Sequence, residues 1–416
     1  MPTQPQTPVW AVLPFVLYLL SIALLPLFAA RLWESNRNKL LYVLALALPV
    51  TIMLVAGGAG ALLVESAREY VAFMALLAAL FVISGGIYLR GSVAGTPLTN
   101  SAFLAVGAII ASLIGTTGAS ALLIRPLLRA NGGRRHTRHL VIFFIFIVAN
   151  GGGLLTPLGD PPLFLGFLRG VPFAWTLRLA APWALCNGAL LAVFFLYDRA
   201  LRRRDGAAEA VVAAEPLRIE GWLNVLLLGG VVGTVFLVGA WRVVALVALA
   251  ALSMKATPPR IHEANRFSWA PMIEVGVVFI GVFVTMVPAL TFLAERGATL
   301  GITRPWQFFW AAGGLSSVLD NAPTYLTFAS LASGVAGVGS LGALAAHSTG
   351  KELLAAVSCG SVLMGAITYV GNGPNFMVKA IAEQHHVRMP SFFGYTLWSL
   401  TVLVPLFAVV ALVFFR

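Results

Sequence analysis

The sequence predicts an all-α polytopic membrane protein built from two inverted-topology repeats. Hydrophobic residues make up 59% of the 416 residues and charged residues only 10%, a balance typical of chains embedded in lipid. Apolar runs at 10–30, 40–64 and 391–415 are long enough to cross about 30 Å of hydrocarbon as helices. The first basic residue is Arg31, so the N-terminal run lacks the basic start of a secretory signal peptide. We therefore expect it to be retained as the first helix.

Each half of the chain carries the same interruption of an apolar segment, which indicates the repeat. Residues 150–164 read NGGGLLTPLGDPPLF and residues 365–376 read GAITYVGNGPNF. At one constant offset, five residues of the first segment fall on five of the second: Thr156, Gly159, Asp160, Pro162 and Phe164 on Thr368, Gly371, Asn372, Pro374 and Phe376. Glycine and proline end helices and leave backbone groups that lipid cannot satisfy, so each break should line an enclosed cavity. Paired breaks are typical of secondary transporters.

The first repeat is predicted to occupy residues 1–198. The segment 101–131 is too long for one membrane-spanning helix, and its interruption around Gly115 to Gly118 leaves it too broken for two such helices. Because basic loops flank them, we expect a re-entrant hairpin that enters from the cytoplasm. The other predicted elements are helices over 8–30, 40–62, 69–89 and 175–198, and a broken helix over 139–170.

A basic cytoplasmic linker is predicted at residues 199–219, and the second repeat at 220–416. The repeat follows the same order: apolar stretches at 221–239 and 241–254, a helix over 271–293, an extracytoplasmic re-entrant hairpin over 306–336, a broken helix over 352–384 and a last helix over 391–415. The stretch 241–254 is short for a spanning helix. Each repeat is expected to cross the membrane fully five times, so the whole chain has about ten crossings. Because five is an odd number, the second repeat is inverted relative to the first.

The net charge of +12 is distributed unevenly along the chain. With the N-terminus placed outside, the basic residues gather in the loops of one side, chiefly Arg31, Arg37, Lys39, Arg125, Arg129, Arg134, Arg135, Arg138, Arg199, Arg202, Arg203, Arg204 and Arg218. This asymmetry follows the positive-inside rule, so both termini are expected to be extracytoplasmic. Membrane orientation therefore accounts for the net positive charge, and we expect no nucleic-acid partner.

Polar side chains stranded in apolar segments mark the candidate site. Acids inside a membrane cost about 2.5 to 3.5 kcal/mol on insertion scales and usually mark ion or proton pathways; Asp160, Asp320 and Glu274 meet this condition. Hydroxyl and amide oxygens surround the breaks: Thr116, Thr117, Ser120, Asn150, Thr156, Ser317, Asn321, Thr324, Thr368, Asn372 and Asn375. Hard cations prefer such oxygen ligands, so we expect sodium at these residues and no transition metal.

Several of these residues have a second interpretation. A serine or threonine in a membrane helix can simply bond a carbonyl one turn back. Glu274 follows Pro271 closely, so it is either a proton-relay acid or an interfacial acid at a helix N-terminus. Arg125 and Lys379 either extend to the cytoplasmic interface or meet an anionic substrate or a buried acid.

Enzyme motifs fail on specific residues. The string IHEAN at 261–265 lacks the second histidine of a zinc protease, and Glu352 stands after Lys351 where a phosphate loop needs serine or threonine. No G-x-S-x-G occurs, and the two cysteines, Cys186 and Cys359, have no spacing that suggests a disulfide or a metal site. We therefore expect neither catalysis nor a cofactor.

Five segments carry a resemblance to a known superfamily: GTTGASALLIRPLLRAN from Gly115, NGGGLLTPLGDPPLFLGF from Asn150, EVGVVFIGVFVTM from Glu274, SSVLDNAPTYL from Ser316 and VGNGPNF from Val370. They resemble the ion-transporter superfamily over nearly the whole chain, and are most similar to bacterial NhaD-type sodium/proton antiporters and CitMHS-like citrate transporters. The resemblance implies a homodimer in the bacterial inner (plasma) membrane, in which a scaffold holds two moving units, each with a hairpin and a broken helix.

The resemblance also implies roles for the hairpin tips. The tip role falls on Thr116, Thr117 and Ser120 in one half and on Asp320, Asn321 and Thr324 in the other. Both tips resemble Ser-Asn-Thr in the dicarboxylate carriers of the superfamily. Here the first tip reads Gly-Thr-Thr-Gly and the second brings an aspartate, which would repel an anion unless a cation intervened.

The sequence therefore favours a sodium/proton antiporter that works by alternating access, with a sodium- or proton-coupled citrate or dicarboxylate transporter as the alternative. In the antiporter, sodium and protons compete for one buried carboxylate, for which Asp320 and Asp160 are the candidates, with Glu274 as a relay. We expect Asp320→Asn to stop exchange, and Asp160→Asn, which copies Asn372, to be milder. A cation channel is disfavoured because paired, occluded breaks suit alternating access.

Overall fold

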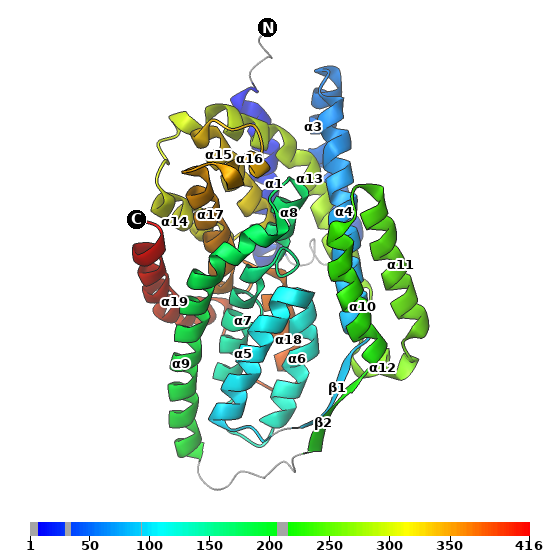
Figure 1. Cartoon of the computed structure of the whole chain (residues 1–416), viewed down its shortest axis with the longest axis vertical. Helices are drawn as coiled ribbons and strands as arrows, with labels where there is room; N and C mark the ends of the chain where they lie inside the picture. Colours follow the sequence, from blue (N-terminus) through cyan, green and yellow to red (C-terminus); the bar gives the residue numbers. More distant parts are fainter. Residues whose placement is uncertain (1–6, 30–34, 93, 206–214) are drawn as a thin grey trace.

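The computed structural model describes residues 7–29, 35–92, 94–205 and 215–416, and most of these residues are helical (Figure 1). The predicted all-α membrane fold is confirmed. By length and hydropathy, eight helices among the described residues could cross a bilayer, and two shorter apolar helices lie at Val9–Ile22 and Trp222–Phe236.

The first half of the chain supplies eight α-helices and one strand to the described structure. They are α1 (Leu13–Phe28), α3 (Asn36–Ala56), α4 (Gly60–Gly85), β1 (Tyr88–Ser92), α5 (Pro97–Ile114), α6 (Thr116–Ala130), α7 (Arg138–Ile147), α8 (Pro161–Leu168) and α9 (Ala180–Asp205). Short 3-10 helices lie at Val9–Val12, Gly151–Leu155 and Phe173–Leu179. Gly115 separates α5 from α6 with a φ of 83°, a left-handed conformation that glycine adopts without strain.

The second half supplies ten α-helices and one strand to the described structure. Its elements are β2 (Glu215–Glu220), α10 (Trp222–Gly233), α11 (Ala240–Ala256), α12 (Pro259–Ala264), α13 (Ala270–Arg296), α14 (Pro305–Ser316), α15 (Asn321–Ala336), α16 (Leu341–Ala346), α17 (Gly350–Met364), α18 (Gly373–Gln384) and α19 (Phe392–Phe414), with 3-10 helices at Thr234–Phe236, Gly297–Thr299 and Gly365–Ile367. The duplicated motif starts α8 and α18 in the same way: an extended Asp160 or Asn372 precedes a helix with proline in its first turn.

The helices form two bodies, each of which combines elements from both halves of the chain. In the first, α13 packs against α1, α3 and α4, and α4 packs against α10 and α11; we call this the scaffold body. In the second, α6 packs on α18, α8 on α15 and α9 on α19; this hairpin body contains α5 to α9 and α14 to α19. Figure 1 shows α3, α4, α10 and α11 on one side and α5, α7, α9, α17 and α19 on the other. The bodies meet where α4 contacts α6 and where α13 contacts α15.

A short antiparallel ribbon pairs the segment after α4 with the segment before α10. Tyr88 of β1 lies opposite Glu220 of β2, and Leu89 lies opposite Ile219. The sequence did not predict these strands; residues 215–219, expected to be linker, form most of β2, and residues 206–214 lie outside the described residues. Pairing satisfies backbone groups that would otherwise need water at this position. The ribbon, α12 and the loop between α6 and α7 define what we call the basic end.

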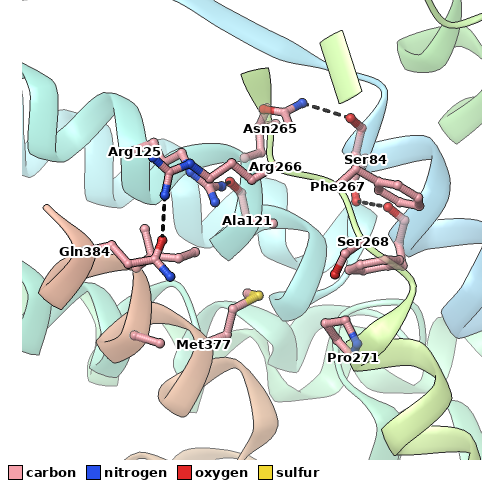
Figure 2. A pocket seen from close by; sticks show the side chains of 15 residues that line it. Ser84, Ala121, Arg125, Asn265, Arg266, Phe267, Ser268, Pro271, Met377 and Gln384 are labelled. Carbon is pink, nitrogen blue, oxygen red and sulfur yellow. Dashed lines mark hydrogen bonds between the residues drawn. The ribbon is translucent and has the colours of Figure 1, made fainter. Parts of the chain in front are cut away.

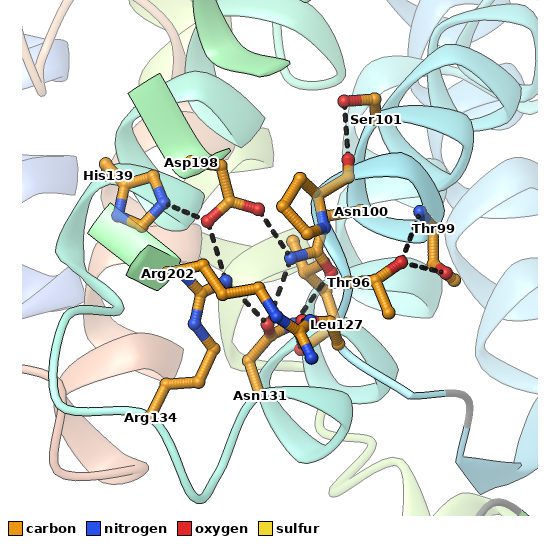
Figure 3. Close-up of polar contacts among 12 residues, drawn as sticks. Thr96, Thr99, Asn100, Ser101, Leu127, Asn131, Arg134, His139, Asp198 and Arg202 are labelled. Atoms are coloured by element: carbon orange, nitrogen blue, oxygen red, sulfur yellow. Dashed lines mark hydrogen bonds and ion pairs between the residues drawn. The ribbon is translucent and has the colours of Figure 1, made fainter. Parts of the chain in front are cut away.

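A buried polar network also lies at the basic end and joins α5, α9 and the loop between α6 and α7 (Figure 3). Its centre is Asp198, which is 0% exposed. The carboxylate accepts hydrogen bonds from Arg134 Nη1 at 2.6 Å, His139 Nε2 at 2.8 Å and Asn100 Nδ2 at 3.0 Å. The helix predicted over 175–198 ends at Asp198, whereas α9 continues to Asp205, which places Asp198 inside the helix.

Candidate ion-binding site

Each helix break is fastened to the hairpin of its own half by the repeated threonine. Thr156 Oγ1 donates a hydrogen bond to the carbonyl oxygen of Ser112 near the end of α5. At the matching position, Thr368 Oγ1 donates to the carbonyl oxygen of Ser317, next to the end of α14, at 2.5 Å. Both hydroxyls also accept a backbone N–H from two residues further along the chain. The duplicated threonines therefore hold the breaks in position, which is a different role from direct ion ligation.

The duplicated glycines allow the backbone to double back on itself. A Cβ added to Gly159 would lie 2.2 Å from the carbonyl oxygen of Gly153, and one added to Gly371 would lie 2.6 Å from that of Gly365. These neighbours are backbone atoms, which cannot move aside as a side chain can. The repeated glycines are therefore required by close packing of the breaks.

Gly371→Ala should destabilise the protein by about 1 to 3 kcal/mol, because the added methyl group would overlap the carbonyl oxygens of Gly365 and Ser316. The matched control is Gly373→Ala, two residues away, where an added Cβ meets nothing within 4 Å. Thermal unfolding of the purified proteins in detergent would measure both. Equal melting temperatures for the two variants would contradict the close-packing role.

Asp160 lies where the two hairpins and the second break meet. Its carboxylate, 1% exposed, accepts hydrogen bonds from three polar side chains. Thr116 Oγ1, at the first hairpin tip, donates to Oδ1 at 2.9 Å, and Asn321 Nδ2, at the second tip, donates to Oδ2 at 2.5 Å. Asn372 Nδ2, from the second break, lies 3.5 Å from Oδ1. One carboxylate thus connects three separate elements.

A row of buried amides continues from Asp160 across the centre of the hairpin body. Asn372 Nδ2 also donates to Asn150 Oδ1 at 3.1 Å, and Asn150 Nδ2 donates to Asn375 Oδ1 at 2.7 Å. Asn375 Nδ2 in turn donates to the carbonyl oxygens of Gly365 and Thr368 at 2.8 and 2.9 Å. These amides are fixed by one another, so they hold the two breaks at a constant distance.

The charge of Asp160 is not balanced by a basic side chain. Among the described residues, no Lys, Arg or His forms an ion pair with it. Two buried oxygens on the hairpins, Oδ1 of Asn321 and Oγ of Ser120, have no hydrogen-bond partner within the described part of the chain. Burying a lone carboxylate is very costly, so a cation or a proton is needed to neutralise it. The oxygens present suit a hard cation such as sodium.

At the second hairpin tip, Asn321 donates a hydrogen bond to Asp160, whereas Asp320 caps the N-terminus of its own helix. Asp320 is the N-cap residue of α15, and its Oδ1 accepts from Ala322 N–H at 3.0 Å. Thr324 Oγ1 donates to the Asp320 carbonyl oxygen at 2.9 Å. The sequence predicts Asp320 as the more important aspartate; in the structure it is the carboxylate of Asp160 that contacts three other candidate residues.

Glu274, Lys379 and Ser317 make their contacts away from the Asp160 carboxylate. Glu274 is 51% exposed and forms an ion pair with Lys39 at 2.5 Å, which ties α13 to α3 inside the scaffold body. Lys379 forms an ion pair with Glu383 at 3.0 Å. Ser317 Oγ donates to the carbonyl oxygen of Gly314 one turn back at 2.7 Å. None of these contacts joins the Asp160 cluster.

Two cavities lie between the bodies. The smaller, about 80 Å³, is lined by Thr116, Thr117 and Asp160 and by apolar side chains of α4 and α13. It has room for water or a small cation. The larger, about 270 Å³, lies at the basic end between α4, α6, α18 and the segment before α13 (Figure 2). Phe81 and Pro271 line both, so the two cavities are neighbours.

Ser112 also belongs to the site, although the sequence did not single it out. Its hydroxyl donates to the carbonyl oxygen of Gly152. The two hairpins align as SLIGTTGAS from Ser112 and SSVLDNAPT from Ser316, and the hydroxyl of Ser316 donates to the carbonyl oxygen of Ser361 at 2.6 Å. The alignment of the two hairpins was the available signal, because a serine occurs at the same place in both.

Comparison with known proteins gives one match over almost the whole chain. The model of a family described as "Putative citrate transport" matches residues 4–415. No curated protein matches the chain. The match agrees with the resemblance to citrate transporters found in the motifs of both halves.

Proposed function

This chain belongs to the citrate-transport family whose model covers residues 4–415, and on that premise we propose that it carries citrate or a related carboxylate together with a cation. The family is one of transporters, and the chain is a multi-pass membrane protein. The observation that supports coupling is the buried carboxylate of Asp160, which has three hydrogen-bond donors and no basic partner among the described residues.

A negative charge at this position opposes an anionic substrate unless a cation binds first. Two like charges 4 Å apart repel by about 4 kcal/mol at an effective dielectric constant of 20. Sodium or a proton on Asp160 removes that repulsion, so cation binding raises the affinity for the carboxylate. Linkage requires the carboxylate to raise the affinity for the cation by the same factor. Such reciprocity is the basis of coupled transport.

The same buried carboxylate also supports the sodium/proton antiporter that the sequence favoured. In that case sodium and protons alternate on Asp160 and no organic anion is carried. The family match favours the citrate carrier over the antiporter.

The proposed orientation places the basic end in the cytoplasm. Arg134, Arg202 and Arg260 lie at this end, as the positive-inside rule requires of a cytoplasmic face. Both termini would then be extracytoplasmic, in the inner membrane of a bacterium, and the resemblance to the superfamily suggests a homodimer. The proposal involves no cofactor and no catalysis.

Transport in liposomes would decide between these functions. Purified protein should take up radiolabelled citrate against its gradient when an inward sodium gradient or an inward proton gradient is imposed, and not when both are absent. The control is an equal imposed membrane potential without either ion gradient. Sodium-driven proton movement with no citrate uptake under any gradient would instead establish the antiporter.

A further inference from the structure

The larger cavity at the basic end has walls from both bodies. The scaffold body contributes the end of α4 and the segment between α12 and α13, and the hairpin body contributes α6 and α18. Its volume of about 270 Å³ is close to the lower end of the roughly 300 to 1,000 Å³ typical of small-molecule sites. It is about three times as large as the cavity beside Asp160, so in this conformation it offers an organic anion more room.

Two arginines, one from each body, line this cavity. Figure 2 shows Arg125 of α6 and Arg266 of the segment before α13 near each other, with Gln384 below them. Arg266 Nη1 donates to Gln384 Oε1 at 3.1 Å, and among the described residues the one hydrogen bond of Arg125 runs from Nη1 to the carbonyl oxygen of Ala121, at 3.5 Å. Most of the donors of both guanidinium groups therefore remain available to a ligand.

Neither arginine has an acidic partner within the described residues, although other basic groups of this region do. Arg134 pairs with Asp198, Lys379 with Glu383 and Arg260 with Glu220, at 2.6, 3.0 and 3.8 Å. Arg125 instead faces the positive charges of Arg266 and Arg129. Like charges around a cavity raise its potential and attract anions.

The positive field extends to the loop that follows α18. Burial, followed by Arg125, Arg266 and Arg129, lowers the pKa of His385 below its ordinary value. The histidine is therefore kept neutral more readily near neutral pH, and the two arginines remain the main charges of the cavity.

The position of Arg266 is fixed by the scaffold body. Its φ is 49°, a left-handed conformation that is uncommon outside glycine. The preceding residue, Asn265, anchors this turn, because its Nδ2 donates to the carbonyl oxygens of Gly85 and Ile87, each at 2.8 Å. Arg125, by contrast, lies on a hairpin helix, so any movement of the hairpin body against the scaffold changes the separation of the two arginines.

We propose that this cavity is a second anion site, which binds a di- or tricarboxylate with one carboxylate on Arg125 and another on Arg266. The planar guanidinium groups match carboxylates, each of which can accept two hydrogen bonds. The bound anion bridges the two bodies and stabilises the conformation described here, in which the cavity is formed. The substrate class rests on the proposed function, whereas the site itself is separate from Asp160.

Cysteine protection tests the site without measuring transport. Cys186 and Cys359 are buried, at 1% and 0% exposure, so Ser268→Cys would place one reactive thiol on the cavity wall. Citrate should slow its reaction with a maleimide in purified, detergent-solubilised protein, and acetate or chloride at equal ionic strength should not. Ala121→Cys offers a second position on the opposite wall if Ser268→Cys is poorly expressed.

Variants then assign the protection to the two arginines. Arg125→Gln and Arg266→Gln should each raise the citrate concentration needed for half-protection roughly tenfold or more, because each removes charged hydrogen bonds. Arg260→Gln is the matched control, since Arg260 is a basic residue of the same end that pairs with Glu220 and does not line the cavity. Size-exclusion profiles would verify that every variant is folded.

Three results would overturn the site: equal protection by chloride, unchanged protection in both arginine variants, or protection given only by vesicles of anionic lipid. The last would mean that the arginines bind lipid phosphate. Asp160→Asn should retain protection by citrate. If citrate protects the thiol but is never transported, the anion site is supported and the proposed function is wrong. If citrate is transported but does not protect the thiol, the proposed function is supported and the anion site is wrong.

Discussion

Asp160→Asn should abolish cation-coupled transport while the protein stays folded. The substitution preserves the size of the side chain and removes the charge that a bound cation needs. At 4 Å and an effective dielectric constant of 20, that charge contributes about 4 kcal/mol, which is roughly a thousandfold in cation affinity. The hydrogen bonds of the new amide can still be satisfied by Asn321. Its Nδ2 already donates to residue 160, and its Oδ1, which has no hydrogen-bond partner in the described structure, can accept from the new NH2 group. Liposome uptake under sodium and proton gradients measures the loss.

Asp320→Asn is the matched control for this experiment. Asparagine caps a helix about as well as aspartate does, so α15 should keep its N-terminal hydrogen bond and transport should persist. Near-normal uptake by Asp160→Asn would remove Asp160 from the mechanism. Complete loss of transport in Asp320→Asn, with transport retained in Asp160→Asn, would instead support the prediction from the sequence that Asp320 is the carboxylate shared by cation and proton.

The helix breaks could be predicted because the residues that cause them are visible in the sequence. Gly115 ends α5, and prolines follow Asp160 and Asn372 at the starts of α8 and α18. Glycine and proline act on their own backbone, so their effects are local. The ribbon of β1 and β2 depends on pairing between segments far apart in the chain, and short polar strands give no comparable local signal.

The candidate site could be predicted in composition but not in geometry. Asp320 and Asn321 are neighbours at one hairpin tip, and the sequence does not show at which of them α15 begins. Asp320 at the N-cap turns back to its own helix, while Asn321, the first helical residue, reaches Asp160. A shift of one residue rotates a side chain by about 100° around a helix, and the position of a helix start is set by packing that the sequence does not reveal.

Asp198→Asn should destabilise the protein by about 3 to 5 kcal/mol, the second large effect that we expect. Arg134 would keep its buried charge and lose the carboxylate that lies 2.6 Å from Nη1, and removing one partner of a buried ion pair is costly. His139 and Asn100 donate to different oxygens of Asp198, so one of the two would face an amide NH2 group in place of its acceptor. Denaturant unfolding of purified protein, or its thermal stability in detergent, would measure the change.

The control is Glu220→Gln, which breaks two ion pairs at the same end of the molecule. Their arginines, Arg90 and Arg260, are 68% and 75% exposed and lie 3.5 and 3.8 Å from Glu220, so each lost pair should cost less than about 1 kcal/mol. A double variant, Asp198→Leu with Arg134→Met, removes both buried charges and should recover part of the stability, because no lone charge remains. If the double variant were as unstable as Asp198→Asn, the damage would come from lost packing between α5, α7 and α9 and not from an unpaired charge. The comparison therefore separates electrostatics from packing in the part of the hairpin body that supports the first hairpin.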